Sequence, residues 1–102
     1  MNGSLRIGLA GLGTVGIEVA GRLLQGAVPG VTLTAVCARD RARNRGLDLS
    51  VVRWVDHPVE LAAAGDVDLV VDLIGGTGDP AAALIDSALA VGKSVVTANK
   101  AL

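Results

Sequence analysis

The chain has 102 residues, of which 51% are hydrophobic and 19% charged, and its formal net charge is -1. This composition indicates one globular domain, and the near-neutral charge argues against nucleic acid as a partner. A single cysteine and a single histidine offer neither an internal disulfide nor a pattern of metal ligands, so we expect no metal site.

Neither end nor middle of the chain carries a membrane signal. The N-terminus lacks a charged region followed by an apolar one, and Gly, Pro or charged residues interrupt every apolar run. We therefore expect a cytoplasmic protein without a membrane partner. The core must consist of Val, Leu, Ile and Ala, a composition that favours buried parallel strands.

The hydrophobic pattern predicts strands that alternate with helices. In chain order these are a strand over 5–10, a helix over 14–24, a strand over 31–38, a strand over 50–55, a short helix over 57–64, a strand over 67–74, a helix from Pro80 to 91 and a strand over 94–97. Short connections predict an α/β fold of the Rossmann type, with a doubly wound parallel sheet in the order 3-2-1-4-5. Since a complete fold of this kind has two halves, we expect 1–102 to be a dinucleotide-binding domain whose second half is incomplete.

Three glycines follow the first strand at the spacing that binds a dinucleotide. Gly11 suits the tight turn, Gly13 lets backbone approach a pyrophosphate, and Gly16 lets the helix lie against the strand. The free N–H groups at the start of that helix would face the diphosphate. The alternative is a structural glycine turn, but the strand–turn–helix–strand context favours NAD or NADP binding.

The residue after the second strand bears on the choice of cofactor. NAD-binding versions of the fold place an acidic residue there, whereas this chain has Arg39, which would pair with the 2′-phosphate of NADP. Asp40 is the nearby carboxylate that could serve NAD. We favour NADP, with a solvated charged turn as the alternative for Arg39 and for the arginines that follow it.

Two later segments reach the same edge of the predicted sheet. Gly76 could bring backbone close to the cofactor, and Thr77 offers a hydroxyl. Lys100, just beyond the last strand, could bind a substrate oxygen or take part in proton transfer, although a surface lysine is the simpler alternative. Asp72 ends the fourth strand, where a buried carboxylate needs hydrogen bonds, and we assign it no catalytic role. We interpret Trp54 as a packing residue.

Three segments of the chain resemble the amino-terminal part of homoserine dehydrogenase. They are Gly11-Leu-Gly-Thr-Val-Gly16, Val71-Asp-Leu-Ile-Gly-Gly-Thr77 and Gly92-Lys-Ser-Val-Val-Thr-Ala-Asn-Lys-Ala-Leu102. The last is the most specific. The resemblance implies an oxidoreductase that interconverts L-homoserine and L-aspartate 4-semialdehyde with NAD(P), a step in threonine, methionine and isoleucine biosynthesis.

The resemblance also implies roles for single residues. The lysine that matches Lys100 lies between cofactor and substrate and belongs to the proton-transfer arrangement, which makes Lys100 the catalytic candidate. Thr14 and Val15 match backbone contacts to the diphosphate, and Arg39 matches a contact to the 2′-phosphate.

Two more matches, Thr77 and Asn99, fall at positions that line the cofactor cleft. The family continues into a substrate and dimerisation domain, so we expect that domain downstream of Leu102 and a homo-oligomer in the full-length protein. We predict no turnover by the 102-residue chain alone, because transition-state stabilisation needs groups from both sides of the substrate.

Two other interpretations remain open. A related enzyme such as an aspartate dehydrogenase would share the fold and parts of the glycine fingerprint, but the ending Thr97-Ala-Asn-Lys100 weighs against it. A non-catalytic nucleotide-sensing module would instead use cofactor binding to control a partner.

Overall fold

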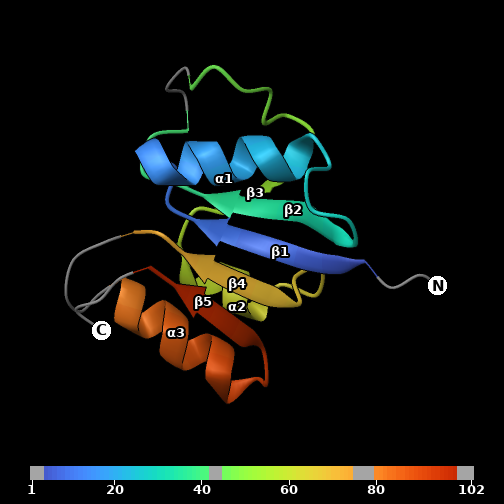
Figure 1. Cartoon of the computed structure of the whole chain (residues 1–102). Helices are drawn as coiled ribbons and strands as arrows, with labels where there is room; N and C mark the ends of the chain where they lie inside the picture. The colour runs from blue at the N-terminus through green and yellow to red at the C-terminus, as the bar shows by residue number, and fades with distance from the viewer. Residues whose placement is uncertain (1–3, 42–44, 75–79, 99–102) are drawn as a thin grey trace.

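The computed structural model of the chain describes residues 4–41, 45–74 and 80–98, and these form a central parallel sheet flanked by helices (Figure 1). The strands are β1 (Leu5–Ala10), β2 (Val31–Cys37), β3 (Arg53–Trp54), β4 (Leu69–Asp72) and β5 (Ser94–Thr97). The helices are α1 (Thr14–Leu24), α2 (Val59–Ala63) and α3 (Ala81–Ala90). The sheet order is β3-β2-β1-β4-β5, which confirms the predicted Rossmann-type topology.

The two faces of the sheet carry separate hydrophobic cores because side chains alternate along each strand. On β1, Ile7 and Leu9 belong to the core shared with α1, whereas Ala10 belongs to the core shared with α2 and α3. Figure 1 shows α1 on one side of the sheet and the other two helices on the opposite side. The small side chain of Ala20, which is fully buried in the core shared with α1, lets this helix lie close to the strands.

A one-residue bulge in β2 sets which side chains face which core. The register with β1 jumps from Leu33 to Ala35, so Thr34 is an extra residue in the strand. The Thr34 hydroxyl donates to the carbonyl oxygens of Ile7 at 3.2 Å and Asp66 at 2.7 Å. As a result Leu33 and Ala35, which strict alternation would place on one face, lie in different cores.

The predicted third strand, 50–55, is wrong in extent, because β3 contains only two residues. The segment before β3 forms turns instead of pairing with β2. The Asp48 carboxylate accepts the amide of Ser50 at 3.1 Å. The amide of Val52 then donates to the carbonyl of Leu49 at 3.4 Å. These local bonds use backbone groups that a longer strand would have offered to the sheet.

Helix α3 begins one residue later than predicted. The Pro80 carbonyl accepts the first helical bond, from the Leu84 amide at 3.1 Å, so Pro80 is the N-cap and not the first helical residue. Strand β4 and helix α2 are likewise shorter than the apolar runs that predicted them, 67–74 and 57–64. The order and type of all eight elements nevertheless agree with the sequence pattern.

Backbone hydrogen bonds continue past the strand ends and tie the exits of the strands together. The amide of Gly11 donates to the carbonyl of Cys37 at 2.9 Å, which joins the exits of β1 and β2. The amide of Leu73 donates to the carbonyl oxygen of Ala10 at 2.8 Å, which joins the exit of β4 to β1. These bonds hold the starts of the loops in place at the carboxyl edge of the sheet.

Candidate functional site

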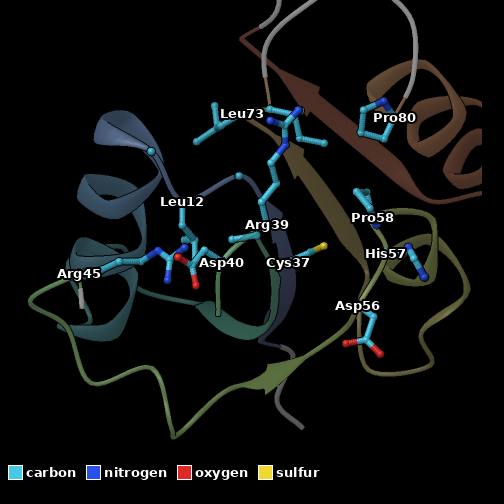
Figure 2. A pocket seen from close by; sticks show the side chains of 14 residues that line it. Leu12, Cys37, Arg39, Asp40, Arg45, Asp56, His57, Pro58, Leu73 and Pro80 are labelled. Atoms are coloured by element: carbon cyan, nitrogen blue, oxygen red, sulfur yellow. The ribbon is translucent and has the colours of Figure 1, made fainter. Parts of the chain in front are cut away.

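A cleft of about 610 Å³ lies at the carboxyl edge of the sheet, where the chain order switches between β1 and β4. This volume is within the usual range of small-molecule and cofactor sites. The lining residues follow β1, β2, β3 and β4 and precede α3: they include 11–13, 37–40, 56–58, 73–74 and Pro80. Figure 2 shows these side chains around one space although they are far apart in the sequence.

Gly11 shapes the inner end of the cleft. Its φ of +99° is in the left-handed region, and a Cβ atom there would lie 2.7 Å from the carbonyl oxygen of Leu73. Gly16 is buried in the first turn of α1, and a Cβ on it would overlap the carbonyl oxygen of Gly11. The two glycines therefore let the β1 loop, the β4 exit and α1 pack closely together.

Gly13 differs from both because the space around it is open. It is the N-cap of α1, it is exposed, and a Cβ on it would meet no atom within 4 Å. No side chain caps this end of the helix, and the first-turn amides, those of Thr14, Val15 and Gly16 among them, have no acceptor inside the helix. The start of α1 thus offers free N–H donors and the positive end of the helix dipole, and no side chain blocks access to the backbone at Gly13. This arrangement is suited to binding an anion.

The side chains of Thr14 and Val15 do not line this cleft. Val15 is 60% exposed, and Thr14 borders a separate hollow between α1 and Leu47. What these two residues can offer to a ligand in the cleft is their backbone N–H groups.

Arg39 lies at the exit of β2 and lines the cleft, as its place in the sequence predicts. In Figure 2 its side chain extends from the strand end in the direction of Leu73. Within the described part of the chain Arg39 makes no ion pair, whereas Arg41 pairs with Asp56 at 3.4 Å. The Arg39 guanidinium is therefore available to an anionic group in the cleft, and Asp40 lines the same wall.

The wall opposite Arg39 was not predicted from the sequence. It consists of Asp56, His57 and Pro58, which follow β3, and Figure 2 shows them across the cleft from the β2 exit. The signal that could have found them is topological: β3 is parallel to β2 and adjacent to it, so both exits lie at the same edge. His57 lies in this wall, and its backbone amide donates to Glu60 at 2.9 Å, which fixes the entry to α2.

Trp54 packs beside the α1 core, as predicted, and its indole N–H donates to the carbonyl of Leu49 at 3.1 Å. Two arginine guanidinium groups also lie over its ring, a contact that the sequence did not predict. The guanidinium carbons of Arg41 and Arg45 lie 5.3 and 5.7 Å from the ring centroid, within cation–π range. Part of the basic segment is thus anchored on β3.

Two residues with buried side chains, Asp72 and Cys37, are the last residues of β4 and β2, directly before chain segments that line the cleft. Asp72 is fully buried and accepts the amide of Ile74 at 3.0 Å, which confirms the predicted hydrogen bonding of its carboxylate by a loop N–H. Its other oxygen accepts the hydroxyl of Thr97 at 2.9 Å. Cys37 is 4% exposed, and burial raises the pKa of its thiol, so it remains a small apolar packing residue, as predicted.

Four predicted site residues lie outside the described residues: Gly76, Thr77, Asn99 and Lys100. The described chain leads toward both segments, since Ile74 and Pro80 line the cleft and β5 ends at Thr97.

The described residues contain no group of three His, Cys, Asp or Glu side chains that could hold a metal ion. The helices in these ranges are also too short, or not apolar enough, to cross a membrane.

Comparison with known proteins agrees with this geometry. The family model described as "Homoserine dehydrogenase, NAD binding domain" matches residues 11–102. The homoserine dehydrogenase of Neisseria gonorrhoeae is 39% identical over 105 residues, which cover 96% of this chain and 24% of that protein. The enzyme of Bacillus subtilis is 35% identical over 106 residues, covering 97% of this chain and 24% of the relative.

A solved structure shows the same arrangement of elements. The crystal structure of Staphylococcus aureus homoserine dehydrogenase at pH 8.5 superposes with a TM-score of 0.79 at 28% identity, over 100% of this chain and 27% of the other. The chain thus spans about a quarter of the length of the curated relatives it matches.

Proposed function

Because this chain belongs to the homoserine dehydrogenase family, as its NAD-binding domain, we propose that the full-length protein interconverts L-homoserine and L-aspartate 4-semialdehyde with NAD(P). The chain contributes the cofactor half of the site. The substrate half and a dimerisation surface belong to a domain downstream of residue 102, and the full-length protein is a homo-oligomer.

The observation that carries this proposal is the open backbone at Gly13. A side chain at this position would meet nothing in the protein within 4 Å, so the protein's own packing does not require glycine here. A ligand that must approach the backbone closely does require it. The adjoining first-turn amides of α1 supply the donors that a diphosphate needs.

The residues present fit a dinucleotide from end to end. Gly11, Gly13 and Gly16 form the turn, with the amides of Thr14 and Val15 directed by the helix start to the diphosphate. The apolar parts of the lining, Leu12, Ala38, Leu73 and Ile74 among them, suit flat heterocycles.

NADP is the preferred cofactor in this proposal. Arg39 is a cation in the cleft wall without an ion pair in the described part of the chain, and a 2′-phosphate is a dianion that a guanidinium binds through two parallel hydrogen bonds. NAD remains the second candidate, with Asp40 on the same wall as the acceptor for a ribose hydroxyl.

The nicotinamide supplies hydride transfer when it is bound. The chain's own residues hold it and handle the proton. Lys100 binds the substrate oxygen and assists the movement of its proton, while Gly76, Thr77 and Asn99 complete the wall on the β4 and β5 side of the cleft. The 102-residue chain alone binds cofactor without turnover, because the groups on the other side of the substrate are missing.

A turnover assay tests the proposal. Full-length protein is mixed with L-homoserine and NADP, or with L-aspartate 4-semialdehyde and NADPH, and absorbance of the reduced nicotinamide is followed. L-aspartate with NAD is the control for an aspartate dehydrogenase. We expect turnover with the first two pairs and none from residues 1–102. Two results would contradict the proposal. One is turnover with L-aspartate and NAD but not with L-homoserine or L-aspartate 4-semialdehyde, and the other is cofactor binding by the full-length protein without any turnover.

A further inference from the structure

The ladder between β4 and β5 changes character at the cleft. Its inner register pairs are Val70 with Val95 and Val71 with Val96, two apolar pairs. The pair at the carboxyl end is Asp72 with Thr97, and the two side chains are hydrogen-bonded at 2.9 Å. A polar pair thus replaces an apolar one at the row that borders the cleft.

Asp72 is an expensive residue to place there. Its side chain is fully buried, and no ion pair within the described ranges involves it. A buried carboxylate without a cationic partner costs free energy that a valine at the same position would not. The stability of the sheet therefore does not explain why an aspartate is present at this position. The two hydrogen bonds of its carboxylate suggest what the residue does.

Each carboxylate oxygen binds a different strand exit. Oδ1 accepts the amide of Ile74, in the segment that leaves β4. Oδ2 accepts the hydroxyl of Thr97, the last residue of β5, and the Asp72 backbone carbonyl accepts the amide of Ala98 at 3.2 Å. One residue thereby fixes the directions in which two chain segments leave the sheet.

Both segments carry residues of the proposed site. Gly76 and Thr77 follow Ile74 closely in the sequence, and Lys100 follows Thr97 by three positions. The glycine loop is included in the same arrangement, since Leu73 packs against Gly11 and donates its amide to Ala10. A shift at Asp72 would therefore change the placement of the β4 and β5 exits relative to the cofactor loop.

We propose that Asp72 is a positioning residue: its carboxylate joins the exits of β4 and β5 and so fixes the places of Ile74 and Thr97 at the edge of the sheet that borders the cofactor cleft. The consequence for catalysis rests on the proposed function. Asp72 itself need not touch cofactor or substrate, and its effect passes through Thr97 and Ile74.

The test compares Thr97→Val, Thr97→Ser and Thr34→Val in the full-length protein. Thr97→Val removes the hydroxyl at the cleft end of the sheet and Thr97→Ser restores it. Thr34→Val is the matched control, because it removes a half-buried hydroxyl with two backbone acceptors at the bulge in β2, three residues before the end of that strand at the cleft. Unfolding midpoints, dinucleotide Kd, kcat and amide hydrogen exchange are measured for each.

We expect Thr97→Val to lower kcat by about tenfold to a hundredfold with little change in dinucleotide Kd, since small displacements of reacting groups have effects of that size. Thr97→Ser should recover most of kcat, and Thr34→Val should lower the unfolding midpoint but leave kcat unchanged. Equal kcat in Thr97→Val and Thr34→Val would overturn the proposal.

Hydrogen exchange separates this proposal from the proposed function. The amides of Ile74 and Ala98 should exchange faster in Thr97→Val than in wild type or Thr34→Val. If the wild type fails to turn over homoserine, the proposed function has failed, and exchange then decides the positioning role. Unchanged exchange at both amides in Thr97→Val would overturn it.

Discussion

Gly11 and Leu73 approach each other so closely that a Cβ atom on Gly11 would lie 2.7 Å from the Leu73 carbonyl oxygen. The contact joins the exit of β1 to the exit of β4 at the point where the sheet reverses its order. A glycine is therefore required here for two separate reasons, the positive φ and the backbone contact, and these can be separated by experiment.

Gly11→Ala should be much more destabilising than Gly26→Ala. Gly26 has a φ of +74° but no atom within 4 Å of its Cβ position, so alanine there meets only the backbone strain, about 1–2 kcal/mol. Gly11→Ala adds a collision with backbone, which we expect to cost about 1–3 kcal/mol more. Urea unfolding of both variants measures the difference, and equal free energies of unfolding would show that the contact with Leu73 is relaxed at little cost.

Gly13→Ala should leave the fold nearly as stable as wild type, whereas Gly16→Ala should destabilise it. A Cβ on Gly13 meets nothing, so its free energy of unfolding should change by no more than about 1 kcal/mol, the cost of alanine at an N-cap. A Cβ on Gly16 overlaps Gly11, so that variant should be strongly destabilised.

The binding measurement completes the comparison at Gly13. If a diphosphate lies against this residue, the new methyl group should weaken NADPH binding by about 1–3 kcal/mol, the usual cost of overpacking. Isothermal titration of wild type and Gly13→Ala measures it. A stable variant with unchanged affinity would mean that the diphosphate does not approach Gly13.

Lys93 is expected to stabilise α2 without any part in the cleft. Its ammonium group donates to the carbonyls of Ala62 and Ala64, both at 2.6 Å, and so satisfies the C-terminal end of that helix. Lys93→Met should lower the free energy of unfolding by about 1–3 kcal/mol, the cost of leaving buried acceptors unpaired. Dinucleotide affinity should not change, and a loss of affinity at constant stability would contradict this assignment.

The stability of the domain should depend on Asp68 at low pH. Hydrogen bonds from the guanidinium and the backbone amide of Arg6 lower the pKa of this carboxyl to about 2. Because the folded-state pKa is below the unfolded value of about 3.9, the interaction stabilises the fold above pH 4 and is lost as the pH falls toward 2.

Urea unfolding of wild type and Asp68→Asn between pH 7 and pH 2 measures this effect. The difference in unfolding free energy should be constant near neutrality and shrink between about pH 4 and pH 2. High salt should reduce it at neutral pH, because the side chains of Arg6 and Asp68 are 44% and 36% exposed. A difference that does not vary with pH would show that the ion pair has no effect on stability.

The bounds of β1, α1 and β5 agree with the prediction residue by residue. A flanking glycine does not explain this agreement, because the predicted segments 57–64 and 67–74 also end at glycines and are longer than α2 and β4. The third strand was overestimated because Asp48 and Ser50 form a local turn, which hydrophobic periodicity does not register. The Thr34 bulge was not foreseen for a similar reason, since its acceptors lie on two other segments.

The sequence predicted those parts of the candidate site that belong to a recognisable local motif. Gly11, Gly13 and Arg39 were identified because each follows a strand with a known chemical requirement, and all three line the cleft. The opposite wall at His57 and Pro58 was missed although the predicted sheet order already places the third strand beside the second. These two residues match no motif of their own, and only the adjacency of the strand exits brings them to the cleft.

The central claim is that this cleft binds a dinucleotide with its diphosphate at the start of α1 and its 2′-phosphate at Arg39. Fluorescence titration with NADPH and NADH, for wild type and for Arg39→Ala, tests it most directly. We expect wild type to bind NADPH more tightly than NADH, and Arg39→Ala to lose about 1.5–3 kcal/mol of NADPH affinity, the contribution of a hydrogen bond to a charged group, with little change for NADH. Equal NADPH affinity in wild type and Arg39→Ala would contradict the assignment of Arg39, and binding of neither cofactor would contradict the site itself.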